Sequence, residues 1–142
     1  GLNKARDLIA VASAIATAHI AAAQGRRADA ITALRDAVAK EDKLDYDEPA
    51  DWFIPVRHLL GTQLLGARKA KEAEQVYRED LQRHPENGWA LYGLAQSLKA
   101  QRKTRQAAAV GRRFAQAWKD ADVVLTSSYT SSPRPGAATP DS

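Results

Sequence analysis

The sequence predicts an all-α fold, an α-solenoid of about three helical hairpins that ends in a flexible C-terminal tail. The first observation is composition: the strong helix formers alanine, leucine, glutamine, arginine, lysine and glutamate dominate the 142 residues, and aromatic residues make up only 6%. The second observation is a weak internal repeat, which is the signature of stacked supersecondary units. A chain of this length is most simply one folded domain, placed here at residues 1–124.

Self-comparison at fixed offsets locates the repeat. An offset of 34 aligns the middle of the chain with its later part, and an offset of 43 aligns the first part with the middle. The aligned pairs are Leu60 with Leu94, Leu64 with Leu98, Ala73 with Ala107, Ala18 with Gly61, and Ala30 with Ala73. These offsets define units at about 11–44, 54–87 and 88–121. Residues 45–53 form an acidic inserted linker between the first two units.

Each unit is predicted to form two helices. In chain order they cover 3–23, 27–41, a stretch from the Asp51 cap to about Gly66, the stretch between Gly66 and Pro85, 89–101 and 104–120. Gly25 separates the first pair. Asp51, Asn87 and Thr104 are predicted N-caps, because a side-chain oxygen can accept hydrogen bonds from the free N–H groups of the first turn. Pro55 falls in a first turn, where its missing N–H costs little.

Small and large residues alternate in a way that explains the repeat. Ala18, Gly61 and Ala95 occupy matching positions, where a nearly absent side chain lets two helices of a hairpin approach closely. Large residues such as Leu34 and Tyr77 are predicted to fill the space between successive hairpins. Because one hairpin cannot bury such a face alone, the units must stack.

The middle unit resembles the tetratricopeptide repeat, whose consensus has Leu-Gly-x-x-Tyr, then Ala-x-x-x-Phe, then Pro. It contains LGTQL, Ala73 four residues before Tyr77, and Pro85. The third unit has LAQSL and Ala107, but Gly111 stands where a large residue is expected. Residues 5–125, including YDEPADWFIPVRHLLG, also resemble the C-terminal part of longer bacterial proteins of this family. The resemblance implies a repeat scaffold with further repeats upstream, and it transfers no catalytic residue.

In a tetratricopeptide array, the first helices of successive units line a concave inner surface, and this register predicts a groove that binds a protein or peptide partner. The predicted groove residues are His19, His58, Thr62, Leu65, Trp89, Tyr92, Gln96 and Lys99. Aromatic anchors such as Trp89 and Tyr92 suit an inserted peptide or helix. The alternative interpretation is that both aromatic side chains simply pack against the neighbouring linker.

Metal binding is not predicted. His19 and His58 share the inner surface, and two imidazoles can bind metal or sense pH, but a zinc site needs three or four ligands and no third is evident. The chain has no cysteine. The acidic residues of 41–51 do not match an EF-hand loop, which needs Gly at its sixth place and Glu at its twelfth. We expect these carboxylates to stay in water while Leu44, Tyr46, Trp52 and Phe53 pack against the hairpins.

Six basic residues gather around the last predicted hairpin: Lys99, Arg102, Lys103, Arg105, Arg112 and Arg113. With a net charge of +4 they would suit phosphate contacts, but aromatic residues for base stacking are sparse, and Phe114 and Trp118 are predicted to be core. Nucleic acid or another anion is therefore the least favoured partner. The sequence contains no Gly-rich phosphate loop and no nucleophile turn, so no catalytic residue and no cofactor are predicted.

The two ends of the chain complete the prediction. The apolar segment Leu8–Ala23 is judged too short and too rich in alanine for a membrane span. A cytoplasmic location is favoured, and residues 125–142 form a disordered tail because they lack apolar mass. The predicted function is that of a non-catalytic scaffold for protein–protein interaction. The second hypothesis is assembly, in which the alanine-rich first helix packs on upstream repeats or on a second copy of the chain.

Overall fold

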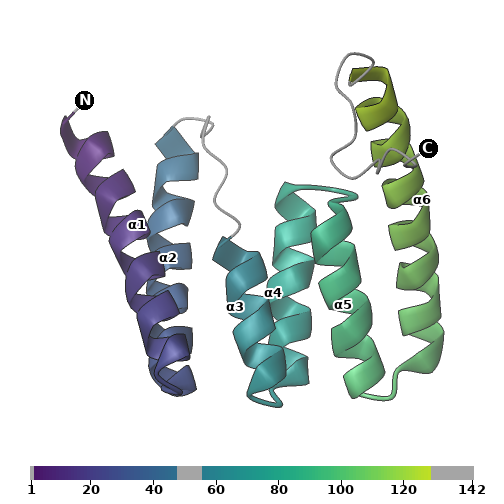
Figure 1. Cartoon of the computed structure of the whole chain (residues 1–142), viewed down its shortest axis with the longest axis horizontal. Coiled ribbons are helices and arrows are strands. Elements are labelled where there is room, and N and C mark those ends of the chain that lie inside the picture. Colours follow the sequence, from purple (N-terminus) through teal and green to yellow (C-terminus); the bar gives the residue numbers. More distant parts are fainter. Residues whose placement is uncertain (1, 48–55, 129–142) are drawn as a thin grey trace, which may run out of the picture.

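Six α-helices make up the described part of the chain, residues 2–47 and 56–128, in a computed structural model (Figure 1). The helices are α1 (Leu2–Ala23), α2 (Arg27–Asp47), α3 (Val56–Gly66), α4 (Ala70–Arg83), α5 (Gly88–Ala100) and α6 (Thr104–Ser128). Within these residues there is no strand. The all-α prediction is confirmed.

The helices follow one another in chain order along the long axis of the molecule, and their directions alternate (Figure 1). Each helix packs on the helix before it and the helix after it, and α3 also contacts α5. The arrangement is therefore helical-repeat-like, with contacts mainly between neighbours in the sequence.

Three short turns, which join α1 to α2, α3 to α4 and α5 to α6, have the same backbone geometry. Each contains one residue with positive φ: Gly25 at 75°, Arg68 at 61° and Arg102 at 60°. The next N–H donates to a carbonyl five residues earlier, from Arg26 to Ala21 at 2.8 Å, from Lys69 to Leu64 at 2.8 Å and from Lys103 to Leu98 at 2.9 Å. This is the Schellman motif, which satisfies the last carbonyls of a helix. The three turns are separated by the same offsets, 43 and 34, that align the sequence.

Tyr77 joins two neighbouring hairpins. Its side chain, from α4, is almost completely buried. A Cβ atom added to Gly61 of α3 or to Gly93 of α5 would collide with the Tyr77 ring. The predicted small residue at Gly61 is therefore explained by direct contact with Tyr77, and Gly93 has the same role on the next hairpin.

Two glycine substitutions, one at Gly93 of α5 and one at Gly111 of α6, should change the free energy of unfolding in opposite directions. Gly93→Ala places a methyl group where it clashes with the Tyr77 ring. We expect the free energy of unfolding to fall by about 1–2 kcal/mol, because overpacking outweighs the gain in helix propensity. Gly111→Ala meets no atom within 4 Å, and we expect a gain of up to about 1 kcal/mol. Urea unfolding followed by circular dichroism measures both. Equal effects of the two substitutions would contradict the contact with Tyr77.

α2 is longer than predicted. It ends at Asp47 and not near residue 41, so it includes the first residues of the predicted linker 45–53. Leu44 is buried, as predicted, and it continues the buried stripe of Ile31, Leu34 and Ala37 along the helix. An established helix extends at little cost while its residues still find such contacts. Predictions about Asp51, Trp52, Phe53 and Pro55, and about the side chain of Tyr46, lie outside the described residues and side chains.

The third hairpin matches the prediction at the start of α5 but not at the two ends of α6. The predicted cap at Asn87 is confirmed, because its side-chain oxygen accepts hydrogen bonds from the N–H groups of Trp89 at 3.0 Å and Ala90 at 3.4 Å. The predicted cap at Thr104 is wrong, because Thr104 is the first residue of α6 and not the residue before it. That helix continues to Ser128, past the predicted domain end at residue 124, so 125–128 are helical. The rest of the predicted tail, 129–142, lies outside the described residues.

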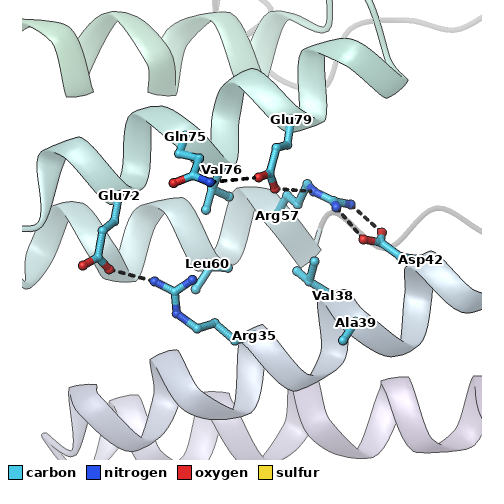
Figure 2. Close-up of a pocket in the computed structure, with 10 residues that line it drawn as sticks. All are labelled: Arg35, Val38, Ala39, Asp42, Arg57, Leu60, Glu72, Gln75, Val76 and Glu79. Atoms are coloured by element: carbon cyan, nitrogen blue, oxygen red, sulfur yellow. Dashed lines mark hydrogen bonds and ion pairs between the residues drawn. The ribbon is translucent and has the colours of Figure 1, made fainter.

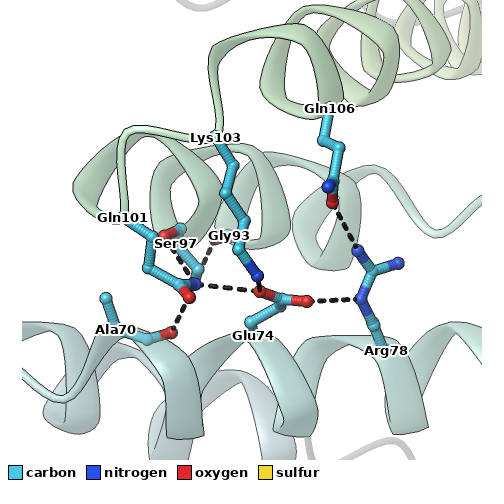
Figure 3. Close-up of polar contacts among 8 residues, drawn as sticks. All are labelled: Ala70, Glu74, Arg78, Gly93, Ser97, Gln101, Lys103 and Gln106. Atoms are coloured by element: carbon cyan, nitrogen blue, oxygen red, sulfur yellow. Dashed lines mark hydrogen bonds and ion pairs between the residues drawn. The ribbon is translucent and has the colours of Figure 1, made fainter.

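A polar cluster around Glu74 joins α4 to the turn between α5 and α6 (Figure 3). The Glu74 carboxylate accepts hydrogen bonds from Gln101 at 2.9 Å, Lys103 at 3.0 Å and Arg78 at 2.8 Å. The amide of Gln101 also donates to the carbonyl of Ala70 at 3.4 Å. These hydrogen bonds, above all those from Arg78 and Lys103, lower the pKa of Glu74 from its ordinary value of 4.5 to about 2.

The Glu74 cluster predicts a pH-dependent contribution to stability. Because the pKa is lower in the folded state, the stabilisation is present above the ordinary value of 4.5 and is lost as the pH falls toward about 2. Glu74→Gln should therefore lower the free energy of unfolding by about 2–3 kcal/mol near neutral pH, with a much smaller difference near the acid end of this window. Urea titrations of both proteins across the window test this. A difference that does not depend on pH would contradict it.

Candidate partner-binding surface

Four aromatic side chains from α5 and α6 form an aromatic patch: Trp89, Tyr92, Phe114 and Trp118. The Asn87 cap starts α5 so that Trp89 and Tyr92, three residues apart, lie on one face of the helix. Trp89 is 58% exposed, and Tyr92 and Trp118 are each 48% exposed. Phe114 is half-buried against the core.

The rings of the aromatic patch contact one another. Trp89 meets Trp118 edge to face, with centroids 6.0 Å apart and planes at 85°. Tyr92 lies 5.6 Å from Phe114, and Phe114 lies 5.8 Å from Trp118. Such tilted and T-shaped pairs are favourable arrangements for aromatic rings. Mutual packing therefore holds the side chains in place while large parts of three of them remain open to solvent.

The prediction that Phe114 and Trp118 are core residues is wrong for Trp118 and only partly right for Phe114. Trp118 lies beside Gly88, the first residue of α5, where a Cβ would be 3.9 Å from the indole ring. Because α5 begins there, little of that helix is left to cover Trp118. Trp118 follows Phe114 by one helical turn, and the antiparallel hairpin brings it opposite the start of α5.

His58 from α3 extends the aromatic patch toward the middle hairpin. Its ring centroid is 5.9 Å from that of Trp89 and 6.3 Å from that of Tyr77. Its buried Nδ1 atom has no hydrogen-bond partner. Asp80 lies nearby on α4, and burial raises the pKa of its carboxyl despite the opposing charges of His84, Arg57 and His58. Of the predicted groove residues, the structure thus places His58 against Trp89, and Tyr92 is linked to them through Phe114 and Trp118.

The other predicted groove residues, all within the described part of the chain, make no ring contact with this aromatic cluster. His19 of α1 and Thr62 of α3 line a cavity of about 50 Å³ between the first two hairpins. Leu65 and Gln96 are half-buried, and Lys99 is exposed on α5. His19 thus lies beside Thr62, and His58 beside Trp89. Among the described residues, no group of three or more His, Cys, Asp or Glu side chains could hold a metal ion.

A larger cleft of about 270 Å³, which was not predicted from the sequence, lies between α2, α3 and α4 (Figure 2). Its apolar residues are Val38, Ala39, Leu60 and Val76. Arg57 is only 5% exposed, and its guanidinium donates two hydrogen bonds to Asp42, at 2.8 and 2.7 Å. Glu79 adds a contact to Arg57 at 3.7 Å. This network ties the first hairpin to the second across the undescribed residues 48–55.

The expectation that the acidic residues of 41–51 stay in water is wrong for Asp42. Its carboxylate is bound by Arg57 and also by Arg83, at 3.2 Å. Burial alone would lower the pKa of Arg57, but the hydrogen bond and charge of Asp42, with the charges of Glu79 and Glu41, outweigh burial and raise that pKa. Because the charges that line this cleft are paired, the cleft is best explained as an ionic joint between hairpins.

The basic residues of the last hairpin are only partly free. Lys103 is bound to Glu74 at 3.0 Å, and Arg113 is bound to Glu86 at 2.7 Å. Lys99, Arg102, Arg105 and Arg112 are exposed. Two of the six positive charges are thus already compensated, which weakens the case for an anion-binding surface.

One stretch of α1, Ala5–Ala23, is long and apolar enough to cross a membrane by length and composition. This stretch is three residues longer than the apolar segment Leu8–Ala23, which was predicted to be too short for a membrane span. In the structure α1 packs on α2, and Val11, Ala18 and Ala21 are buried. Packing on α2 accounts for one face of this apolar helix.

Comparison of the chain with protein-family models, with curated proteins and with solved structures finds no match.

Proposed function

We propose that the protein is a non-catalytic scaffold whose stacked helical hairpins bind a segment of a partner protein through the aromatic patch. The stack is proposed to be a solenoid of three tetratricopeptide-type units, with the first helices of the units facing the partner. The recurring Schellman turns at offsets 43 and 34 support the repeat. The observation that carries the binding proposal is the cluster of three large exposed aromatic side chains, Trp89, Tyr92 and Trp118.

The aromatic patch has the physical features of an interaction hot spot. Tryptophan and tyrosine dominate such sites, because they supply a large contact area at a small cost in conformational entropy. Here the rings pack on one another, so less freedom remains to be lost when a partner binds. Lys99 and Gln96 follow Trp89 and Tyr92 along α5 and provide polar groups beside the apolar area.

The proposal predicts a large loss of affinity when the patch is truncated. Peptides would be selected from a displayed random library on the intact protein, and their affinity would be measured by calorimetry. We expect Trp89→Ala combined with Tyr92→Ala to weaken binding at least about 30-fold, which corresponds to one hot-spot residue of about 2 kcal/mol.

The matched control removes exposed apolar area elsewhere. Ile9→Ala combined with Ile20→Ala truncates two exposed side chains of α1 and should leave the affinity unchanged. Circular dichroism would establish that both double variants are folded. Unchanged affinity in a folded Trp89/Tyr92 variant, or equal losses in the two variants, would refute binding at the aromatic patch.

A further inference from the structure

The outward face of α1 is the second exposed apolar surface of the described chain. Ile9 is 69% exposed and Ile20 is 56% exposed. Ala12, Ser13, Ala16 and Thr17, which lie between them, are exposed as well. No charged residue occurs from Leu8 to Gly25. The hydroxyl of Thr17 donates to the carbonyl of Ser13 at 2.9 Å, so this polar group is already satisfied within the helix.

The repeat register shows what this face does in the other hairpins. Gly93 of α5 packs against Tyr77 of the preceding hairpin. The residue 34 positions earlier, Leu59 of α3, lines a cavity together with Ala18 and Leu34 of the preceding hairpin. The residue a further 43 positions earlier is Ala16 of α1, and it is exposed.

A second set of equivalent residues gives the same result. Ser97 of α5 is fully buried, and its hydroxyl donates to the carbonyl of Gly93 at 2.9 Å. Gln63 of α3 lines the cavity against the first hairpin. The equivalent residue in α1 is Ile20, which is exposed. The surface that α3 and α5 bury against another hairpin is therefore open in α1.

The opposite end of the stack differs in charge. α6 exposes Arg105, Arg112 and Lys119, a polar outer surface of the kind that keeps the end of a helical stack in solution. Head-to-tail stacking of α6 on α1 would place these charges against an uncharged apolar face, which is costly. The α1 face therefore needs a partner that is itself uncharged.

We propose that the α1 face binds the α1 face of a second copy of the chain, in an antiparallel, two-fold symmetric pair. A two-fold contact needs a self-complementary surface. In an antiparallel pair, Ile9 of each copy lies opposite Ile20 of the other, and the small residues Ser13 and Ala16 meet at the centre, where the helices approach closely. Arg6, exposed near the start of α1, then lies near the C-terminal end of the other α1, where the helix dipole is negative.

Molecular mass measured across concentration tests this proposal. Because one helix per copy buries less than the ~1,200 Å² of a standard stable interface, we expect a reversible dimer with a Kd on the order of 10–100 μM. Sedimentation equilibrium should show the mean mass rising from 15.4 kDa toward twice that value. A monomer at all concentrations up to about 1 mM would overturn the proposal.

Two matched variants locate the contact. Ala16→Glu places one carboxylate from each copy at the centre of the pair and should weaken dimerisation at least about 10-fold, because like charges would be buried together. Ala108→Glu is the same change on an exposed position of α6 and should have no effect. Both should keep the helical circular dichroism of the parent.

Two results would show that the α1 face is not the dimer contact. An equal dimer Kd for Ala16→Glu and Ala108→Glu would place the contact elsewhere and overturn the proposal. A monomer that binds neutral phosphatidylcholine vesicles, and loses that binding in Ala16→Glu, would assign the α1 face to a lipid surface and would also overturn it.

Discussion

Replacing Tyr77 by alanine is expected to lower the free energy of unfolding by about 3–5 kcal/mol, the usual cost of removing a buried aromatic ring. The Tyr77 ring is buried against Gly61 of its own hairpin and Gly93 of the next, so its loss opens a cavity that neither glycine can fill. The packing of α4 on α3 and the packing of α4 on α5 both lose their central contact. Urea unfolding followed by circular dichroism measures the change.

Tyr77→Phe is the control, since it keeps the ring and removes only the hydroxyl. We expect it to cost no more than about 1.5 kcal/mol, the contribution of one hydrogen bond. A Tyr77→Ala protein as stable as Tyr77→Phe would show that the ring does not hold the hairpins together, and the packing described for α3, α4 and α5 would be wrong.

The second large effect is expected at the ionic joint between the first two hairpins. Asp42→Ala removes the carboxylate that accepts two hydrogen bonds from the buried guanidinium of Arg57 (Figure 2). A buried charge without its partner costs about 3–5 kcal/mol. Because Asp42 is partly exposed and Glu79 remains 3.7 Å from Arg57, we expect a smaller loss, about 2–3 kcal/mol.

Another ion pair in the same cleft provides the control. Arg35 and Glu72 lie 2.7 Å apart, but both side chains are about half exposed. Arg35→Ala should change the free energy of unfolding by less than about 1 kcal/mol, as is usual for a surface ion pair. If Asp42→Ala and Arg35→Ala have equal effects, the burial of Arg57 does not matter to stability, and the cleft is not a structural joint.

Much of the local structure could be predicted because it depends on residues close in the sequence. The helix formers specify the helices. Gly25 specifies a turn, Gly61 a close approach between helices, and Asn87 a helix cap. Each of these features arises from the conformational freedom or side-chain chemistry of one residue acting on its neighbours. The same register predicted a shared surface for His58 and Trp89, whose ring centroids lie 5.9 Å apart.

What could not be predicted depends on how long helices are and on which side chains meet across them. The extension of α2 to Asp47 brings Asp42 to Arg57 of α3, 15 residues away, and nothing in the local pattern identifies that pair. The exposure of Trp118 depends on where α5 begins and not on the apolar character of Trp118 itself. Periodicity predicts which face of a helix is apolar, but not how far the neighbouring helix covers it.

The most direct test of the proposed function observes the tryptophans themselves. The chain has three tryptophans, so their indole N–H signals in a nuclear magnetic resonance spectrum can be assigned by single substitutions. When the protein is saturated with a peptide selected for binding, the account predicts that the Trp89 and Trp118 signals shift or broaden. A peptide that binds at saturation and leaves both signals unchanged would contradict it.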